Sequence, residues 1–232
     1  MSHYAVAVFH MPDQDIDELL APYDENLETE PYLRYTKQEA IKEARALYGP
    51  DYTDEELYEI IADGYIKDDD GNLLSTYNQN AKWDWYVIGG RFSDMLKLKA
   101  SGDWTDSAKV ADIDFSPDEE EYQSALRFWE VVIDGEALRD GENSEDFYTF
   151  YKPEYLKGRY LTKENYASLR AAFHTYAVIT PDGEWHAPGE MGYFAMTSET
   201  DEEGLNWDLS YKKTFIDAAD PNWSLTIVDC HI

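Results

Sequence analysis

Cysteine is almost absent from this sequence, because Cys230 is the only one in 232 residues. A single cysteine excludes a disulfide within the chain and leaves a cysteine-based zinc site short of ligands. Cys230 stands in an apolar, strand-like segment. We therefore expect it to be a small buried hydrophobic residue rather than a reactive thiol.

Positive charge is also scarce. The chain has 19 lysines and arginines against 49 aspartates and glutamates, which gives a formal net charge of −30. A field of this sign repels nucleic acid and anionic membranes and favours cationic partners. We therefore expect no direct binding to nucleic acid or to a membrane. The acidic surface has two interpretations, a solvated surface that maintains solubility and a mimic of a nucleic-acid backbone.

Long apolar runs are absent as well. No stretch approaches the roughly 18 apolar residues that span a bilayer. The first residues lack the basic segment, apolar stretch and cleavage site of a secretory signal. The expected location is the cytoplasm.

The few basic residues are unevenly distributed along the chain. Ten of the 19 fall in two short segments, 82–109 and 152–170. The first of these contains the aromatic and glycine-rich motif described below. A local anion site inside an acidic protein is therefore compatible with the charge pattern.

Aromatic residues, in contrast, make up 15% of the chain, which indicates a folded core. Short apolar segments rich in β-branched residues predict strands over 4–9 and 223–230. Caps and apolar periodicity predict helices over 15–21, 36–48, 53–63, 117–132, 162–173 and 207–218. Further strands are predicted over 92–99, 176–180, 184–186 and 192–196, with a turn at 68–72 between two strands.

This order of elements predicts an α+β fold. We expect a central, mostly antiparallel sheet that contains the N- and C-terminal strands, paired with each other, and helices packed on it. The prediction is a single domain over residues 1–232. The acidic, glycine-bearing segment 134–146 is the best place for a boundary if the chain subdivides.

The most informative segment, 82–92, reads Lys-Trp-Asp-Trp-Tyr-Val-Ile-Gly-Gly-Arg-Phe. Its tryptophans carry large rings that stack on planar groups. Its glycine pair lets the backbone turn sharply and approach another group closely, and the arginine adds a rigid fork of donors. The segment predicts a ligand pocket, and the alternative is a core strand with a glycine turn. The candidate binding residues are Lys82, Trp83, Trp85, Gly89, Gly90 and Arg91.

A second segment, 185–192, reads Trp-His-Ala-Pro-Gly-Glu-Met-Gly and offers an indole, an imidazole and two glycines on a predicted loop. Loops positioned by a scaffold often carry binding residues. Trp185 and His186 are therefore candidate ligand-binding residues, and the alternative is that they complete a hairpin.

Catalytic, cofactor and metal motifs are not evident. The five histidines show no close metal spacing, and no Gly-x-Ser-x-Gly elbow occurs. We expect no bound metal and no cofactor, and we assign no catalytic residue. Asp229 and His231 share one face of the last predicted strand, a pattern compatible with two metal ligands or with acid–base chemistry.

Several of these segments together resemble a family of uncharacterised phage and prophage proteins of Gram-positive gut bacteria. The resemblance covers both ends and the centre of the chain, at residues 1–8, 19–23, 82–92, 180–186, 189–192 and 225–232. The family usually reads Trp-Asp-Trp-Tyr-x-Ile-Gly-Gly-Arg-Trp at the centre, and here Phe92 replaces the final tryptophan. The resemblance implies a phage accessory protein in the cytoplasm of a bacterial host.

The leading hypothesis is a counter-defence protein that sequesters a small nucleotide-type immune signal. A tryptophan would stack on the base, the basic residues and glycine amides would hold phosphate, and His186 would bond ribose or base. The pocket would lie within one chain or between subunits of a homo-oligomer.

Two alternatives come from other classes of protein. The first is an inhibitor or nucleic-acid mimic that binds a basic host protein through the acidic helices 36–48, 53–63 and 117–132. The second is an enzyme acting on a nucleotide, with His186, Asp229 or His231 as acid or base.

Overall fold

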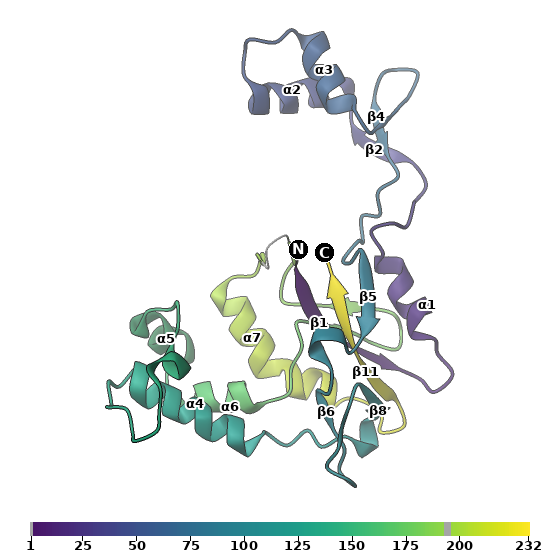
Figure 1. Ribbon diagram of the computed structural model, residues 1–232. Helices are drawn as coiled ribbons and strands as arrows, with labels where there is room; N and C mark the ends of the chain where they lie inside the picture. The colour runs from purple at the N-terminus through teal and green to yellow at the C-terminus, as the bar shows by residue number, and fades with distance from the viewer. Residues whose placement is uncertain (1, 193–195) are drawn as a thin grey trace. The chain divides into compact units, whose positions relative to one another are not determined.

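The computed structural model describes residues 2–192 and 196–232, and its elements are labelled in Figure 1. The helices are α1 Ile16–Leu20, α2 Lys37–Tyr48, α3 Asp54–Ala62, α4 Glu119–Val132, α5 Pro153–Tyr160, α6 Lys163–Ala171 and α7 Asp201–Tyr211. The strands are β1 His3–His10, β2 Tyr32–Tyr35, β3 Ile66–Lys67, β4 Leu73–Ser75, β5 Trp85–Ile88, β6 Leu96–Lys97, β7 Trp104–Thr105, β8 Ser107–Lys109, β9 Ala177–Ile179, β10 Trp185–His186 and β11 Ser224–His231.

The chain divides into two compact units. The first unit combines Met1–Leu20 with Lys82–Ile232, and the second is Ala21–Ala81. Segment 134–146, which the sequence marks as a place for a boundary, lies inside the first unit.

The first unit is built on a six-stranded sheet with the order β10-β9-β1-β11-β5, in which β8 also pairs with β11. β1 and β11 run antiparallel along their whole length, from His3 opposite His231 to His10 opposite Ser224. The predicted pairing of the first and last strands is therefore confirmed, as is the α+β class. One pair, β1 with β9, is parallel, and the other pairs are antiparallel.

The composition of β1 and β11 explains their central position. Both are rich in apolar and β-branched residues, and both are buried along nearly their whole length. Strands covered on both faces require such continuous apolar runs. Cys230 lies in β11 and is fully buried, and the burial raises the pKa of its thiol.

Helix α7 and the π-helical turn Lys212–Ile216 cover part of one face of this sheet. The ring of Tyr211 is buried there with Phe215, against sheet residues such as Phe9 and Ile227. The Tyr211 hydroxyl has a buried partner, because its oxygen lies 2.8 Å from Thr175 Oγ1. α7 begins at Asp201, six residues before the predicted start.

Helices α4, α5 and α6 form a group beside α7 (Figure 1). Their small core contains Trp129, Ile133 and Leu156. Helix α4 is confirmed, but it begins at Glu119 instead of residue 117. Asp118 is the N-cap, because its carboxylate accepts a hydrogen bond from the backbone N–H of Glu121.

Arg127 in α4 holds the following segment in place. Its guanidinium binds Glu136 and makes two hydrogen bonds of 2.9 Å to the Glu142 carboxylate. These bonds favour the charged carboxylate and lower the pKa of Glu142 to about 2.

We predict that Arg127→Gln raises the pKa of Glu142 back towards its ordinary value near 4.5. The wild-type pKa is lowered, so the stabilising effect of this carboxylate is complete above about pH 5 and is lost as the pH falls towards 2. A carboxyl-detected NMR titration of both proteins measures the shift. An unchanged pKa in the variant would contradict the assignment to Arg127.

The second unit, Ala21–Ala81, packs α2 and α3 on the small sheet β2-β4-β3. Both helices begin as the sequence predicts, with complete capping boxes from Thr36 and Thr53. The turn at 68–72 joins β3 to β4, which confirms that prediction. The core of the unit contains Ala40, Tyr58 and Leu73.

Two predicted strands need comment. The strand predicted over 92–99 is wrong for most of its length, since only Leu96–Lys97 is extended. The chain turns instead at Gly90–Phe92, and Asp94 takes a positive φ while its N–H bonds the Asp106 carboxylate. The strand predicted over 192–196 lies largely outside the described residues.

Candidate functional site

Strand β5 places the central motif at the edge of the sheet. It pairs with the C-terminal half of β11, with Trp85 opposite His231 and Val87 opposite Asp229. Because opposite residues of paired strands share a face, these four side chains lie on one side of the sheet. β8 takes over as the neighbour of β11 beyond this point.

The glycine pair forms the turn that ends β5. Gly89 and Gly90 have φ values of 69° and 59°, a region that favours glycine. A Cβ atom on Gly90 would lie 2.6 Å from Asp229 Oδ2, and one on Gly89 would lie 2.3 Å from Asp106 Oδ2. The glycines are therefore needed for the backbone to approach two carboxylates. They do not form a free cradle for a ligand.

Asp229 connects the turn to the N-terminal strand. Its carboxylate accepts a hydrogen bond of 2.9 Å from the backbone N–H of Arg91, through Oδ2. Its other oxygen lies 2.9 Å from His3 Nδ1. Asp229 is 2% exposed, so this buried carboxylate has two partners that compensate its loss of water.

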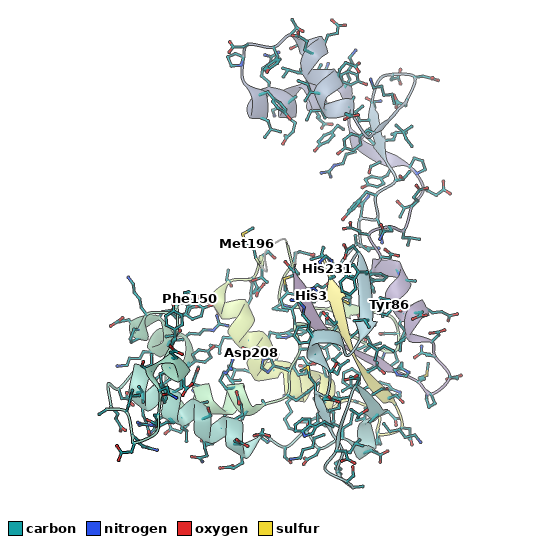
Figure 2. All side chains as sticks on the ribbon, viewed as in Figure 1. His3, Tyr86, Phe150, Met196, Asp208 and His231 are labelled. Atoms are coloured by element: carbon teal, nitrogen blue, oxygen red, sulfur yellow. The ribbon has the colours of Figure 1, made fainter. Side chains whose placement is uncertain are left out.

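A second imidazole–carboxylate pair lies beside the first. His231 Nδ1 is 2.6 Å from Asp84 Oδ1. The two imidazole rings contact each other at a centroid distance of 4.9 Å and an angle of 71°. Figure 2 shows His3 and His231 together at one end of the sheet.

Trp85 covers this pair. Its ring stacks on His231 at 4.9 Å and 17°, and it meets the ring of His3 edge-on at 5.4 Å. The indole is nevertheless 44% exposed. We name Trp85, His3, His231, Asp84 and Asp229 the Trp85 cluster.

Arg91 is joined to this cluster through its backbone N–H, which bonds Asp229. Arg91 is exposed and lies on the 3-10 turn Gly90–Phe92, which follows β5. Among the ion pairs formed by the described residues, none involves its guanidinium. No carboxylate of the described chain therefore neutralises this arginine, and its role in binding an anion stays a prediction.

Lys82 and Trp83, which are also predicted binding residues of the motif, contact other parts of the protein. Lys82 makes an ion pair with Glu190, with Nζ 2.7 Å from Oε2. Trp83 is only 7% exposed and packs edge-on against Tyr86 at 5.0 Å. Trp83 is thus a core residue, while Trp85, two positions later, faces solvent.

Trp185 and His186 lie in β10, at the opposite edge of the sheet from β5. They form the return strand of a hairpin with β9. The ring of Trp185 meets Tyr4 edge-on at 6.4 Å, and the His186 ring lies against Phe215 at 5.4 Å. The structure therefore does not bring His186 into the Trp85 cluster.

His186 borders a separate hollow of about 550 Å³. Its walls include Phe215 and Trp223, with the carboxylates of Asp182 and Glu184 at the same hollow. The Asp182 carboxylate accepts a hydrogen bond from Thr180 Oγ1, which lowers the pKa of Asp182.

Comparisons with protein-family models, curated proteins and solved structures give no match to this chain. Across residues 2–192 and 196–232, no three histidine, cysteine, aspartate or glutamate side chains are placed to share a metal ion. No helix in the same ranges is long and apolar enough to cross a bilayer.

Two members of the Trp85 cluster, His3 and Asp84, are not among the residues that the sequence singles out for binding. The signal that points to them is the antiparallel register of β1 and β11, which places His3 opposite His231. Asp84 lies next to β5, where its backbone N–H bonds the His231 carbonyl oxygen. Both residues can be assigned to the cluster only when the pairing of the strands is known.

Proposed function

We propose that the protein binds a small nucleotide-type ligand at the Trp85 cluster. The observation that carries this proposal is the exposed Trp85 ring, which lies against the imidazoles of His3 and His231. Arg91, which has no ion pair in the described chain, is joined to the same cluster through its backbone N–H to Asp229. An exposed indole stacks on a base with about 1–3 kcal/mol, and a guanidinium binds phosphate through two parallel hydrogen bonds.

The contacts of the cluster carboxylates support binding of an anion by this acidic protein. Asp84 and Asp229 are the carboxylates of the cluster, and each has an N–H partner in an imidazole. Arg91 extends the positive side of the site. In the setting that the resemblance to phage proteins implies, the protein acts in the cytoplasm of the host and removes an immune signal by sequestering it.

The proposal is tested by equilibrium dialysis against a mixture of adenine and guanine mononucleotides, cyclic mononucleotides and cyclic dinucleotides. The retained compound is released by heat and identified by mass spectrometry. We expect wild-type protein to retain one of them in stoichiometric amount. Trp85→Ala and Arg91→Ala should each weaken retention about 10-fold to 100-fold, since each removes about 1.5–3 kcal/mol of interaction.

Trp104→Ala is the matched control, because Trp104 is exposed to a similar extent in β7, outside the Trp85 cluster. It should leave retention unchanged. Equal losses in Trp85→Ala and Trp104→Ala, or no retained nucleotide in the wild type, would refute the proposal.

A further inference from the structure

We propose that His3 and His231 form an acid–base pair that cleaves a phosphodiester next to a free ribose 2′-hydroxyl. This inference rests on the proposed function, because it assigns a reaction to the same nucleotide site. It is carried by the geometry of the two imidazoles.

Each imidazole is oriented through the same nitrogen. The Nδ1 atoms of His3 and His231 lie 2.9 and 2.6 Å from carboxylate oxygens of Asp229 and Asp84. A carboxylate only accepts hydrogen bonds, so each Nδ1 carries the proton and each neutral ring presents an unprotonated Nε2. This is the arrangement in which an aspartate holds a catalytic histidine in the tautomer that accepts a proton.

The Nε2 atoms of His3 and His231 have no protein partner among the described residues. Neither Nε2 belongs to the small set of described side-chain atoms that are fully buried and lack a hydrogen-bond partner. Each Nε2 is thus left without a hydrogen bond to the described chain, in side chains that are 13% exposed for His3 and 5% exposed for His231.

The surroundings assign different roles to the two rings. His231 stacks flat on Trp85, and the face of an indole attracts a cation. Its partner Asp84 stabilises the same charge. Asp229, in contrast, divides its oxygens between His3 and the Arg91 N–H. These contacts favour a positive charge on the His231 ring more than on the His3 ring, so we assign His231 as the acid and His3 as the base.

The reaction that fits this pair needs no additional reactant. His3 Nε2 takes the proton of the 2′-hydroxyl, and the oxygen forms a bond to phosphorus. The bond from phosphorus to the 5′-oxygen breaks, its electron pair leaves with that oxygen, and His231 Nε2 gives it a proton. The products are a 2′,3′-cyclic phosphate and a 5′-hydroxyl, and solvent restores the two imidazoles. Arg91 supplies positive charge for the phosphoryl oxygens.

The test uses 3′,5′-linked cyclic diadenylate and its 2′-deoxy analogue, which has no 2′-hydroxyl and reports binding alone. We expect the wild type to bind the analogue and to convert the ribose form to a linear 2′,3′-cyclic phosphate, seen by mass spectrometry. His3→Gln and His231→Gln should each slow conversion about 10²-fold to 10⁴-fold. Both should still bind the analogue, which shows that they are folded.

His174→Gln, prepared in the same way, is the control for a contaminating nuclease. His174 is exposed, and its Nδ1 bonds the carbonyl oxygen of Ala172, away from the Trp85 cluster. This variant should convert the ribose form at the wild-type rate.

Three outcomes would count against the inference. Binding of the analogue with an intact ribose form would remove the catalytic role and leave the proposed function standing. Conversion that persists in both histidine variants would assign the activity to another protein. No binding of either compound would remove the proposed function for this ligand class, and the inference with it.

Asp84 is a positioning residue in this scheme. Asp84→Asn should lower kcat at least 10-fold while leaving KM and the affinity for the analogue near their wild-type values, because the amide no longer enforces the Nδ1–H tautomer. A parallel change of KM and affinity would indicate a structural role instead.

Discussion

Gly90→Ala is expected to destabilise the first unit by about 2–5 kcal/mol. A left-handed alanine costs about 1–2 kcal/mol by itself. At Gly90 the new Cβ would also lie 2.6 Å from Asp229 Oδ2 and 2.7 Å from both Asp229 Cβ and Val87 Cγ1. Asp229 is buried and cannot move aside freely, so overpacking adds about 1–3 kcal/mol.

Gly102→Ala separates the two contributions. Gly102 also has a positive φ, of 76°, but a Cβ there meets nothing within 4 Å. It should therefore cost only about 1–2 kcal/mol. Equal losses in the two variants would mean that the close approach to Asp229 contributes nothing.

Tryptophan fluorescence during guanidinium unfolding measures the free energy of unfolding of the first unit in both glycine variants. All seven tryptophans lie in the first unit, between Lys82 and Ile232, and Ala21–Ala81 contains none. The signal is therefore insensitive to the second unit, whose unfolding would otherwise complicate a two-state fit.

The second large effect concerns the two tryptophans of the central motif, which we expect to behave in opposite ways. Trp83→Ala should cost about 3–5 kcal/mol, because it removes a buried aromatic side chain and leaves a cavity beside Tyr86. Trp85→Ala should cost less, about 1–3 kcal/mol, since the exposed ring loses its stacked contact with His231 and its edge-on contact with His3. For ligand retention we expect the reverse order. Trp85→Ala should remain folded but retain less nucleotide.

Trp83→Phe provides the control for the buried position. The indole N–H of Trp83 has no hydrogen-bond partner among the described residues, so phenylalanine sacrifices volume but no bond. It should recover most of the stability lost in Trp83→Ala. Thermal unfolding monitored by circular dichroism distinguishes the variants. A small loss of stability in Trp83→Ala would contradict the assignment of Trp83 to the core.

Local signals in the sequence are sufficient for much of the fold. Thr36 and Thr53 each precede a glutamate by three residues, and both capping boxes form. The same pattern at Thr200 and Glu203 predicts the true start of α7, which apolar periodicity alone places too late. The strand expected over 92–99 fails in its first half because the 3-10 turn Gly90–Phe92 runs into it and Asp94 takes a positive φ.

The candidate site is less accessible to sequence reasoning, because its parts meet through pairing over long distances. The motif identifies Trp85 and Arg91, but it does not reveal that Trp83 points into the core. His3 meets Asp229 and His231 only through the register of β1 and β11. Composition likewise gives no means of placing His186 at the far edge of the sheet.

The pairing of β1 with β11 also has a consequence for how the chain acquires its structure. These strands are separated by roughly 220 residues, and contacts at such separations close slowly. During synthesis β1 appears first and β11 after every other element of this chain, so the apolar β1 must wait for its main neighbour. The helices and small sheet of Ala21–Ala81 belong to a separate compact unit, which is complete earlier in the chain and can form meanwhile. The apolar β1 strand is thus without its main neighbour for most of synthesis, and the Trp85 cluster, which needs His231 of β11, assembles only after β11 has been made.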